Sequence, residues 1–392
     1  MNSDYRGKGT KVVVVRSRAI DPGAAKVAKA LSESDFEVRL LLWDRAATAN
    51  EGGSSRYVQS NYRLRAPYDS ISIALYLPIW WLHELEFIFK TNPDVVHVFD
   101  LDTLLPGVIF KLLRRKKLFY TILDFYSANF PPEIPAVIRG LISILEKIGV
   151  GLTDVLFLPH ECRLEQVEGA RPRKVVIMNN SPPDALPDGV VVEAGWQAIT
   201  TLFYAGLLHK SRGLRQVIET VKEIDGVRLL IAGDGPERGY IEAISRRDSP
   251  KVQYLGQIPY SRVIEETRKA DVLFAFYDPS IPNSRYASPN KVFEAMMCGK
   301  PIIVNSEIAA STITREEDCG VMVPYGDSEA IRTAIRLLKN RSDLRKKLGT
   351  NGRTAYEERY DWRIMEQRLL DAYKAAVPSY PPQTVRNVDR PA

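Results

Sequence analysis

One segment of the chain, residues 286–304, carries residue types that together could bind a phosphate. Ser288 suits the N-cap of a helix and Pro289 its first position, because proline has no N–H that would otherwise need a partner. Gly299 is suited to end the same helix, ahead of an apolar run that predicts a buried strand. The backbone amides that this start would leave free are those of Asn290, Lys291 and Val292. With the helix dipole behind them, these amides predict an anion site.

Glu294 lies one turn inside that predicted helix, among apolar neighbours. A carboxylate drawn out of water needs a hydrogen-bonding partner, and the vicinal hydroxyls of a ribose are suitable ones. The alternative is an ordinary amphipathic helix in which Glu294 forms a structural ion pair. A phosphate at the helix start and a ribose one turn later together predict a nucleoside diphosphate.

Two earlier loops in the same half of the chain could complete such a site. Lys210 and Arg212 stand after a predicted strand and just before a helix start, where a pyrophosphate would meet cations and free amides. Gly233 and Gly235 form a tight turn after the next strand. The alternatives are solvated cations and glycines that only the backbone requires. Three such loops in one half favour the nucleotide site.

The elements that must position these loops alternate along the chain. Buried β-branched runs separated by helical patterns are typical of a parallel sheet covered on both faces. The predicted strands are residues 11–16, 37–43, 94–99, 117–123, 154–158, 174–178, 200–204, 227–232, 252–255, 271–276, 301–304 and 321–323. We therefore predict an α/β protein with two doubly wound, Rossmann-like domains, whose ligands lie beyond the carboxyl ends of the strands.

Composition and turn residues set the expected domain limits. At 392 residues the chain exceeds what one core usually supports. The expected parts are an N-terminal domain 1–180, a linker 181–198, a C-terminal domain 199–360, a helix 361–378 that could cross back to the N-terminal domain, and a disordered tail 379–392. The polar start has no secretory signal, so we expect a cytoplasmic protein. Cys162, Cys298 and Cys319 have neither disulfide nor zinc spacing, and no metal is predicted.

The net charge of +6 raises the question of anionic partners. No zinc finger, RNA-recognition or helix-turn-helix pattern accompanies the basic residues, so nucleic acid is not expected. A basic run at 111–117 and an interrupted apolar stretch at 71–89 suggest a hypothesis of reversible binding to an anionic membrane, at its inner face. The alternative is a helix packed inside the domain beside an ordinary charged surface.

Several motifs resemble the family-4 glycosyltransferases of GT-B fold. They are Tyr-Ala-Gly-(five residues)-Arg-Gly-Leu at 204–214, Ile-Ala-Gly-Asp-Gly-Pro-Glu at 231–237, Tyr-Leu-Gly-Gln-Ile-Pro at 254–259 and Ser-Pro-Asn-Lys-Val-Phe-Glu at 288–294. The segments 100–106 and 120–126 look like the family's helix start and acceptor-cleft strand. The resemblance covers roughly residues 10–376 and implies two domains that face a central cleft.

The resemblance implies transfer of a sugar from a UDP- or GDP-type donor to an acceptor hydroxyl, with retention of configuration and no required cofactor. By position, Glu294 would hold the ribose, Arg212 with Lys210 the diphosphate, and the amides near Asn290 and Lys291 the distal phosphate. The other donor-binding positions are Gly206, Gly233, Gly235 and Ser288. Arg212 and Glu294 would thereby act in catalysis, and a glycan or lipid-linked acceptor would bind the N-terminal domain.

Three positions depart from the family pattern. Related sequences often have a histidine where this chain has Leu123, an arginine where it has Leu207, and a glutamate where it has Tyr286. Asp124, which follows Leu123, is therefore a candidate for part of the missing histidine's catalytic role. Asp100-Leu-Asp102 matches a metal-binding Asp-X-Asp pattern, but we predict Asp102 to be a helix N-cap instead.

Two alternative functions remain open on the sequence. A nucleotide-sugar 2-epimerase would need acid and base side chains around the sugar, and the candidates are only His83, His97, His160 and His209. The other is a nucleotide-sugar-binding protein without transferase activity. Donor hydrolysis or transfer to a panel of acceptors distinguishes all three functions.

Overall fold

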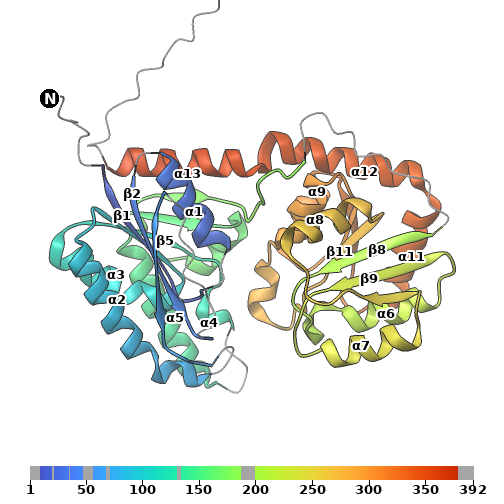
Figure 1. The fold of residues 1–392 in the computed structure, drawn as a ribbon, viewed down its shortest axis with the longest axis horizontal. Helices are drawn as coiled ribbons and strands as arrows, with labels where there is room; N and C mark the ends of the chain where they lie inside the picture. The colour runs from blue at the N-terminus through green and yellow to red at the C-terminus, as the bar shows by residue number, and fades with distance from the viewer. Residues whose placement is uncertain are drawn as a thin grey trace, which may run out of the picture.

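The computed structural model describes residues 9–19, 22–34, 36–46, 56–67, 71–129, 134–186 and 199–377. These residues form two parallel β-sheets with helices around each of them (Figure 1). The predicted α/β architecture of two doubly wound domains is confirmed. The predicted tail 379–392, and residues 187–198 of the predicted linker, lie outside the described residues.

The N-terminal sheet has seven strands in the order β3-β2-β1-β4-β5-β6-β7. Its centre is fully buried because β1 and β4 are runs of β-branched residues that suit a sheet covered on both faces. The strands are β1 Lys11–Arg16, β2 Glu37–Asp44, β3 Val58–Arg63, β4 Val95–Phe99, β5 Lys117–Thr121, β6 Val155–Leu158 and β7 Val175–Ile177. The chain order reverses between β1 and β4, which makes this the topological switch point of the sheet.

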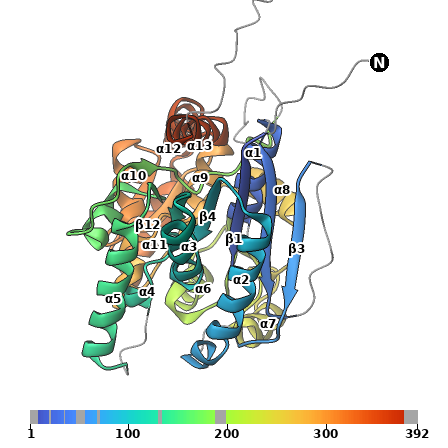
Figure 2. The same cartoon turned by 90° about the vertical axis from the view of Figure 1, so that its left-hand side faces the viewer.

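Two hydrophobic cores cover the faces of this sheet. One of them packs α1 and α13 against the strands, and the other packs α2 and α3. The helices of this part of the chain are α1 Pro22–Glu33, η1 Ile71–Leu75, α2 Leu77–Thr91, α3 Leu101–Arg114, α4 Tyr126–Asn129, α5 Ala136–Gly151 and η2 Glu161–Val167. Figure 2 shows α2, α3 and α5 side by side on the face turned to the viewer.

The C-terminal sheet has six strands in the order β10-β9-β8-β11-β12-β13, with its switch point between β8 and β11. The strands are β8 Thr200–Ala205, β9 Val227–Ala232, β10 Val252–Tyr254, β11 Val272–Ala275, β12 Ile302–Asn305 and β13 Gly320–Val323. The helices between and after them are η3 Lys210–Arg212, α6 Leu214–Lys222, α7 Arg238–Arg247, α8 Tyr260–Lys269, η4 Pro282–Tyr286, α9 Asn290–Met297, α10 Ala309–Glu316, α11 Ser328–Asn340 and α12 Ser342–Ala355.

The chain ends by returning to the N-terminal sheet. After α12, which lies above the C-terminal sheet in Figure 1, a π-helical turn η5 Tyr356–Tyr360 leads into α13 Trp362–Ala376, which lies above the N-terminal sheet. The side chains of Met365, Leu369 and Tyr373 are buried in the core beside β1 and β2. The last helix therefore ties the two domains together.

One strand of the N-terminal sheet was not predicted. β3 is a polar, half-exposed strand at the edge of the sheet, so it has no buried apolar run to reveal it. Its backbone pairs in parallel with β2 from Arg39 to Asp44.

Candidate active site

The loops predicted to bind phosphate meet at the switch point of the C-terminal sheet. Arg212, from the loop after β8, lies with its guanidinium carbon 3.8 Å from the ring centroid of Tyr277, which follows β11. Lys291, from α9, places its Nζ 4.6 Å from the ring centroid of Tyr204 on β8. Two cations from separate segments of the chain thus approach the position at which parallel sheets of this kind bind ligands.

The Lys291 side chain crosses the site to Gly206. A Cβ built at Gly206 would stand 2.7 Å from Lys291 Nζ, so a side chain there would displace the lysine. Gly206 also has a φ of +147°, which favours glycine. Among the described residues, no carboxylate lies within ion-pair distance of Lys291 or Arg212. The site therefore presents two cations without a carboxylate in ion-pair contact, although the charge of the buried Glu294 acts on Lys291 from a longer distance.

The start of α9 differs from the prediction by one residue. The N-cap position is Pro289, whose ψ of 147° is extended, and no side chain caps the helix, so Ser288 as the N-cap was wrong. The buried hydroxyl of Ser288 has no hydrogen-bond partner among the described residues. The amide of Val292 was expected to be free but donates to the carbonyl oxygen of Pro289 at 3.1 Å. No such bond is recorded within the described chain for the amides of Asn290 and Lys291.

Glu294 lies one turn further along α9 and is 6% exposed. Burial raises the pKa of its carboxyl, and this rise is opposed by the charge of Lys291, by a hydrogen bond from Tyr260 and by the charge of Lys26. Lys26 belongs to α1 in the N-terminal domain, so a charge from the other domain also acts on this carboxylate. The apolar neighbours of Glu294 in the sequence correctly indicated its burial.

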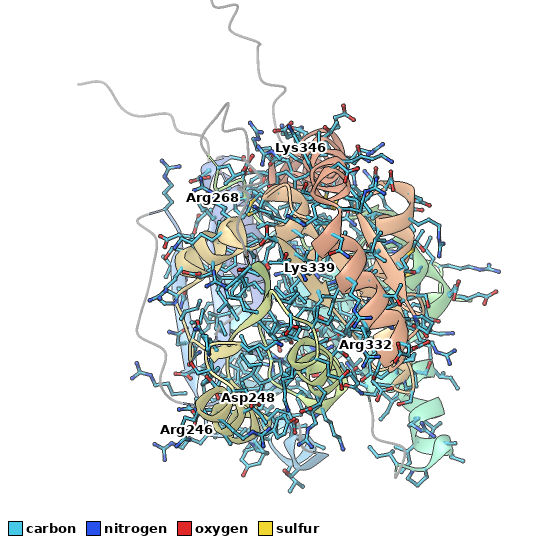
Figure 3. All side chains as sticks on the ribbon, turned by 90° about the vertical axis from the view of Figure 1, so that its right-hand side faces the viewer. Arg246, Asp248, Arg268, Arg332, Lys339 and Lys346 are labelled. Carbon is cyan, nitrogen blue, oxygen red and sulfur yellow. The ribbon has the colours of Figure 1, made fainter. Side chains whose placement is uncertain are left out.

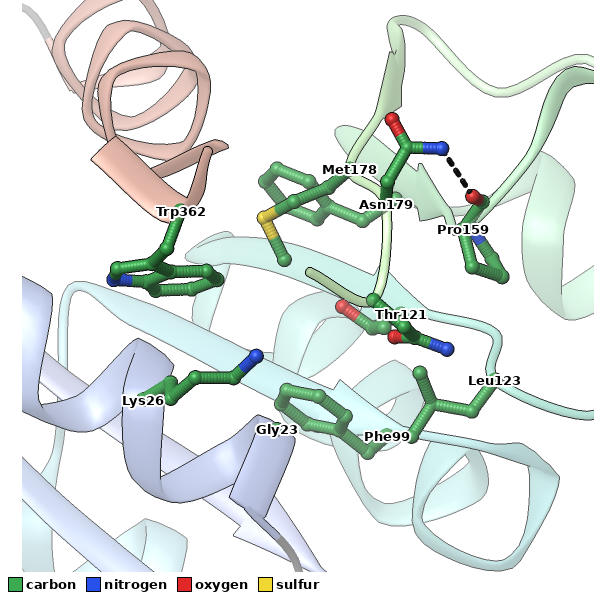
Figure 4. Close-up of a pocket in the computed structure, with 11 residues that line it drawn as sticks. Gly23, Lys26, Phe99, Thr121, Leu123, Pro159, Met178, Asn179 and Trp362 are labelled. Carbon is green, nitrogen blue, oxygen red and sulfur yellow. Dashed lines mark hydrogen bonds between the residues drawn. The ribbon is translucent and has the colours of Figure 1, made fainter. Parts of the chain in front are cut away.

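Lys26 also borders a pocket beside the connection between the domains. Its Nζ donates to the carbonyl oxygen of Ser181 at 2.7 Å and lies 4.5 Å from the Trp362 ring centroid. Figure 4 shows the Lys26 side chain extending beneath the ring of Trp362, with Thr121 and Leu123 to the right of them. The full lining is Gly23, Lys26, Phe99, Thr121, Leu123, Phe157, Pro159, Met178, Asn179, Asn180 and Trp362.

The glycine turn after β9 has a packing explanation. A Cβ at Gly233 would stand 1.9 Å from the carbonyl oxygen of Gly206, and one at Gly235 would stand 2.5 Å from that of Leu208. Both glycines also have positive φ. Close contact between the two loops therefore requires glycine here without any ligand, and a donor-binding role for Gly233 and Gly235 stays a prediction.

Lys210 and Arg212 differ in their surroundings, although both lie in η3. Lys210 is exposed to solvent, whereas Arg212 is half-buried against Tyr277. The turn is held by His209, whose Nδ1 accepts a hydrogen bond from the Ser211 amide at 3.2 Å. Of the two predicted phosphate-binding cations, Arg212 is therefore the one that packs against the domain.

Asp124 lies where the N-terminal domain meets η4. Its Oδ1 accepts a hydrogen bond from Asn283 Nδ2 at 2.7 Å and lies 3.5 Å from a guanidinium nitrogen of Arg163. The Asp124 side chain is still 52% exposed. Tyr286, which replaces the family's glutamate, instead donates a hydrogen bond across the domains to Glu165 at 3.3 Å. One departure from the family pattern, Tyr286, and the residue that follows another, Asp124, thus lie at contacts between the domains.

The Asp-X-Asp segment is engaged within the N-terminal domain. Asp100 occupies the N-cap position of α3, so Asp102 as the N-cap was wrong. The backbone turns at Asp100 with a φ of 60°, and this residue accepts hydrogen bonds from the amides of Leu123 and Asp124. Arg16 pairs with Asp100, while Arg45 pairs with Asp102 at 3.1 Å. No group of three or more side chains suited to hold a metal occurs in the described part of the chain.

Sequence reasoning missed several residues of this site. Tyr204, Tyr260 and Tyr277 supply two ring faces and a hydroxyl, and Lys26 comes from the other domain. The available signal was their position, because Tyr204 and Tyr277 lie at the carboxyl ends of strands. Which way the Lys291 side chain turns could not be read from its spacing.

Comparison with known proteins addresses both domains. Residues 199–340 match the family model described as glycosyl transferases group 1. A phosphatidyl-myo-inositol mannosyltransferase of Mycobacterium leprae is 26% identical over 208 residues, covering 50% of this chain and 54% of that protein. The putative glycosyltransferase EpsD of Bacillus subtilis is 24% identical over 85% of this chain and 89% of its own length. The chain spans about half the length of the first curated relatives it matches.

Solved structures extend the likeness to the whole described chain. Sucrose-phosphate synthase from Thermosynechococcus elongatus superposes with a TM-score of 0.75 at 16% identity, covering 93% of this chain and 98% of that one. The fold is GT-B. HepE from Anabaena, solved with UDP and glucose, has a TM-score of 0.68 at 15% identity and covers 93% of this chain and 100% of its own. Arg212 and Lys291 both belong to the C-terminal domain of this GT-B fold.

Proposed function

We propose that this protein is a glycosyltransferase that moves a hexosyl or N-acetylhexosaminyl group from a nucleoside-diphosphate sugar to an acceptor hydroxyl, with retention of configuration. The observation that carries this proposal is the pair Arg212 and Lys291 at the β8–β11 switch point. Two close cations without a carboxylate partner among the described residues call for an anionic ligand. A donor diphosphate supplies the matching charge.

The rest of the donor fits the same surface. The amides of Asn290 and Lys291 point from a helix start, where phosphate oxygens are favoured. Glu294, one turn on, is placed to accept hydrogen bonds from ribose hydroxyls in exchange for the water that burial removes. The exposed Lys210 adds charge at the margin of the site. Support for UDP as the nucleotide comes from HepE, which was solved with UDP and glucose.

Lys291 offers an explanation for the leucine at position 207. Relatives in the family the sequence resembles often have an arginine directly after the glycine that ends the first C-terminal strand. Leu207 is 49% exposed and carries no charge, but the Lys291 ammonium reaches the adjacent Gly206 from α9. We infer that Lys291 supplies the cation that Leu207 does not.

The proposed chemistry needs positioning and charge more than a protein nucleophile. The bond between the anomeric carbon and the diphosphate oxygen breaks, and the acceptor oxygen bonds to the same face of that carbon. The proton of the acceptor hydroxyl passes to the departing phosphate oxygen. Arg212, Lys291 and the α9 amides stabilise the negative charge that grows on the diphosphate. Asp124, at the domain junction, would position the sugar or the acceptor.

Relatives suggest the class of acceptor. Proteins similar to this chain are named for phosphatidyl-myo-inositol mannosylation, lipopolysaccharide core synthesis and capsular polysaccharide synthesis. We therefore propose a glycan or a lipid-linked glycan as acceptor. An epimerase has less support, because His97 is buried between Tyr373 and Thr121 and burial lowers its pKa to about 3.

The test is donor turnover by the purified protein with a panel of UDP- and GDP-sugars and mixed glycan acceptors. Arg212→Gln should lower kcat/KM by about a thousandfold, because it removes a cation that faces the leaving diphosphate. Arg215→Gln is the matched control, since Arg215 is only three residues away but pairs with Glu237 at the surface. Equal losses in both variants, or no donor turned over by the wild type, would contradict the proposal.

A further inference from the structure

Arg163, on η2 of the N-terminal domain, is a buried cation at the contact between the two domains. It is 3% exposed, and one of its guanidinium nitrogens donates hydrogen bonds to Gln166 Oε1 at 2.8 Å and to Asn283 Oδ1 at 3.0 Å. Asn283 belongs to η4 of the C-terminal domain. Among the described residues, Asp124 is the one carboxylate within ion-pair distance of Arg163, at 3.5 Å. The arginine therefore joins η2, η4 and the loop after β5.

A buried arginine with these partners is a poor source of stability. Taking a guanidinium out of water costs free energy, which a buried and well-paired carboxylate can offset. Asp124 is 52% exposed instead, so solvent weakens its attraction for Arg163. The Nε of Arg163 and the Nε2 of Gln166 are buried without a hydrogen-bond partner in the described part of the chain. The network therefore indicates a role in orienting a side chain more than in stabilising the fold.

The side chain that this network orients is that of Asp124. Its Oδ1 lies next to Arg163 and accepts a 2.7 Å hydrogen bond from Asn283 Nδ2. Its backbone amide donates to Asp100 Oδ1 at 3.2 Å, so the residue is held at both its backbone and its side chain. Its Oδ2 has no hydrogen-bond partner among the residues that the structure describes. A half-exposed carboxylate is thus fixed with one oxygen engaged and the other open.

Asp124 is joined to the segment that leads into the proposed phosphate site. η4 continues into Ser288 and the start of α9, whose amides are proposed to bind the distal phosphate of the donor. The donor sugar is bonded to that phosphate, so it would lie next to this segment. A carboxylate accepts hydrogen bonds and donates none, so its matching partner on a sugar is a hydroxyl.

We propose that Arg163 is a positioning residue, which holds Asp124 so that its Oδ2 accepts a hydrogen bond from one hydroxyl of the donor sugar. This inference rests on the proposed transferase function and deepens it, because it assigns recognition of the sugar to a network built from both domains. The network is complete only while η2 and η4 are in contact. Arg163 itself touches no substrate and acts through the carboxylate.

Charged side chains elsewhere in the protein are paired in a different way. Figure 3 shows them over the outer side of the C-terminal domain, among them Arg246, Asp248 and Arg332. Arg332 pairs with Glu223 and Glu329, which are both exposed. Such surface pairs lie within one domain and fix little, because water competes for both partners.

The basic run of the N-terminal domain is also paired within its own domain. Lys111 and Lys117 lie within ion-pair distance of Asp154, and Lys116 pairs with Asp94. The described helices include none that is long and apolar enough to cross a bilayer. Membrane binding through this run stays a prediction, and these ion pairs, unlike Arg163, do not connect the domains.

Calorimetry that compares a nucleotide sugar with its nucleoside diphosphate tests the proposal. The probes are UDP-glucose against UDP and GDP-mannose against GDP. Arg163→Met should bind the nucleotide sugar about tenfold more weakly than the wild type, because the carboxylate that receives the hydroxyl loses its orientation. Its affinity for the nucleoside diphosphate should stay within about twofold, since that ligand has no sugar hydroxyl to lose. Arg163→Lys keeps the charge but not the planar fork, so its loss should be smaller.

Deoxy sugars separate orientation from a general loss of structure. Among UDP-glucose analogues that each lack one hydroxyl, one should bind the wild type about tenfold more weakly than UDP-glucose. Arg163→Met should bind that analogue as weakly as it binds UDP-glucose, because the contact is already lost. Asp124→Ala should behave in the same way, and adding Arg163→Met to it should cause little further loss. An equal loss for every analogue in Arg163→Met would contradict a positioning role.

The matched control is Arg45→Met, which takes another buried arginine of the N-terminal domain from its carboxylate, Asp102. It should lower the free energy of unfolding and leave the ratio of the two affinities unchanged. Asn283→Ala removes the hydrogen bond to Asp124 without removing a buried charge, so it tests the network even if Arg163→Met does not fold. It should weaken binding of the nucleotide sugar by about threefold and spare the nucleoside diphosphate.

The outcomes distinguish this inference from the proposed function. Equal losses of UDP-glucose and UDP in Arg163→Met, or no loss of either, would overturn the inference and leave the transferase proposal standing. A loss confined to the KM of an acceptor would overturn it too, because the hydroxyl would then belong to the acceptor. No binding of UDP or GDP by the wild type would contradict both proposals.

Discussion

The two sheets of this protein have the same kind of switch point but fill it differently. In the N-terminal sheet, Arg16 at the end of β1 pairs with Asp100 just after β4, and both are buried. In the C-terminal sheet, the equivalent position between β8 and β11 holds Arg212 and Lys291 without a carboxylate partner among the described residues. The first edge pairs its arginine directly with a carboxylate, whereas the two cations of the second edge have no carboxylate in ion-pair contact.

Under the proposed function, this difference would let the two domains of one fold bind two different substrates. A buried ion pair gives a rigid and neutral edge, which suits an acceptor whose hydroxyls form hydrogen bonds. Two cations held over Tyr204 and Tyr277 give an edge that is incomplete until an anion binds. The proposed position of the donor therefore rests on these two cations more than on the fold.

Removing an ion pair of the N-terminal domain, such as Arg45 with Asp102, should lower stability and leave nucleotide binding unchanged. Arg45→Met leaves the buried carboxylate of Asp102 without its arginine, so we expect a loss of about 3–5 kcal/mol in the free energy of unfolding. The double variant Arg45→Met, Asp102→Asn should be less destabilised than the sum of the two single variants. Urea unfolding measures stability and calorimetry measures UDP affinity. A large loss of UDP affinity in the folded Arg45→Met protein would contradict the comparison.

Removing the side chain of Glu294, which is proposed to bind the ribose, should weaken nucleotide binding and leave the fold intact. Glu294→Ala should lose roughly 2–4 kcal/mol of nucleotide binding, because a buried hydrogen-bonding carboxylate is removed. Tyr260→Phe, which removes one hydrogen bond to Glu294, should cost less. Calorimetry with UDP and GDP gives both values. Unchanged affinity in the Glu294→Ala protein would remove the ribose role from this residue.

The N-terminal side also predicts a dependence of stability on pH. Burial raises the pKa of Glu146 from 4.5 to about 8. A raised pKa means that stability is full below the unfolded value and declines as pH rises through the folded one. Relative to Glu146→Gln, the wild type should therefore lose up to about 1.4 kcal/mol of unfolding free energy per pH unit between these two values. Urea unfolding at several pH values measures this difference, and a flat difference would contradict it.

Much of the fold was readable from the sequence because its strands are buried. The runs that form β1 and β9 were predicted with the limits that the structure has, since β-branched residues enclosed on both faces leave a continuous apolar signal. The polar edge strand β3 gave no such signal. The N-cap predicted for α9 was one residue early, and the N-cap predicted for α3 was two residues late. The backbone dihedrals at Pro289 and Asp100, which set these helix starts, have no clear signal in the sequence.

The candidate site was readable in outline but not in its contacts. Spacing placed Arg212, Lys291 and Glu294 in loops and a helix that meet at one sheet edge. The direction of the Lys291 side chain depends on the ring of Tyr204, 87 positions away in the chain, and on the open space above Gly206. Such long-range packing has no counterpart in local spacing. The same holds for Lys26, whose charge acts on Glu294 from the other domain.

The central claim is that Arg212 and Lys291 form a diphosphate site, and calorimetry on Lys291→Met with UDP and with uridine tests it most directly. We predict that UDP affinity falls by about 10- to 100-fold, while uridine affinity stays within about twofold, because the lost charge addresses phosphate. Adding Leu207→Arg to Lys291→Met should restore part of the UDP affinity. Equal losses for UDP and uridine, or no loss for either ligand, would contradict the account.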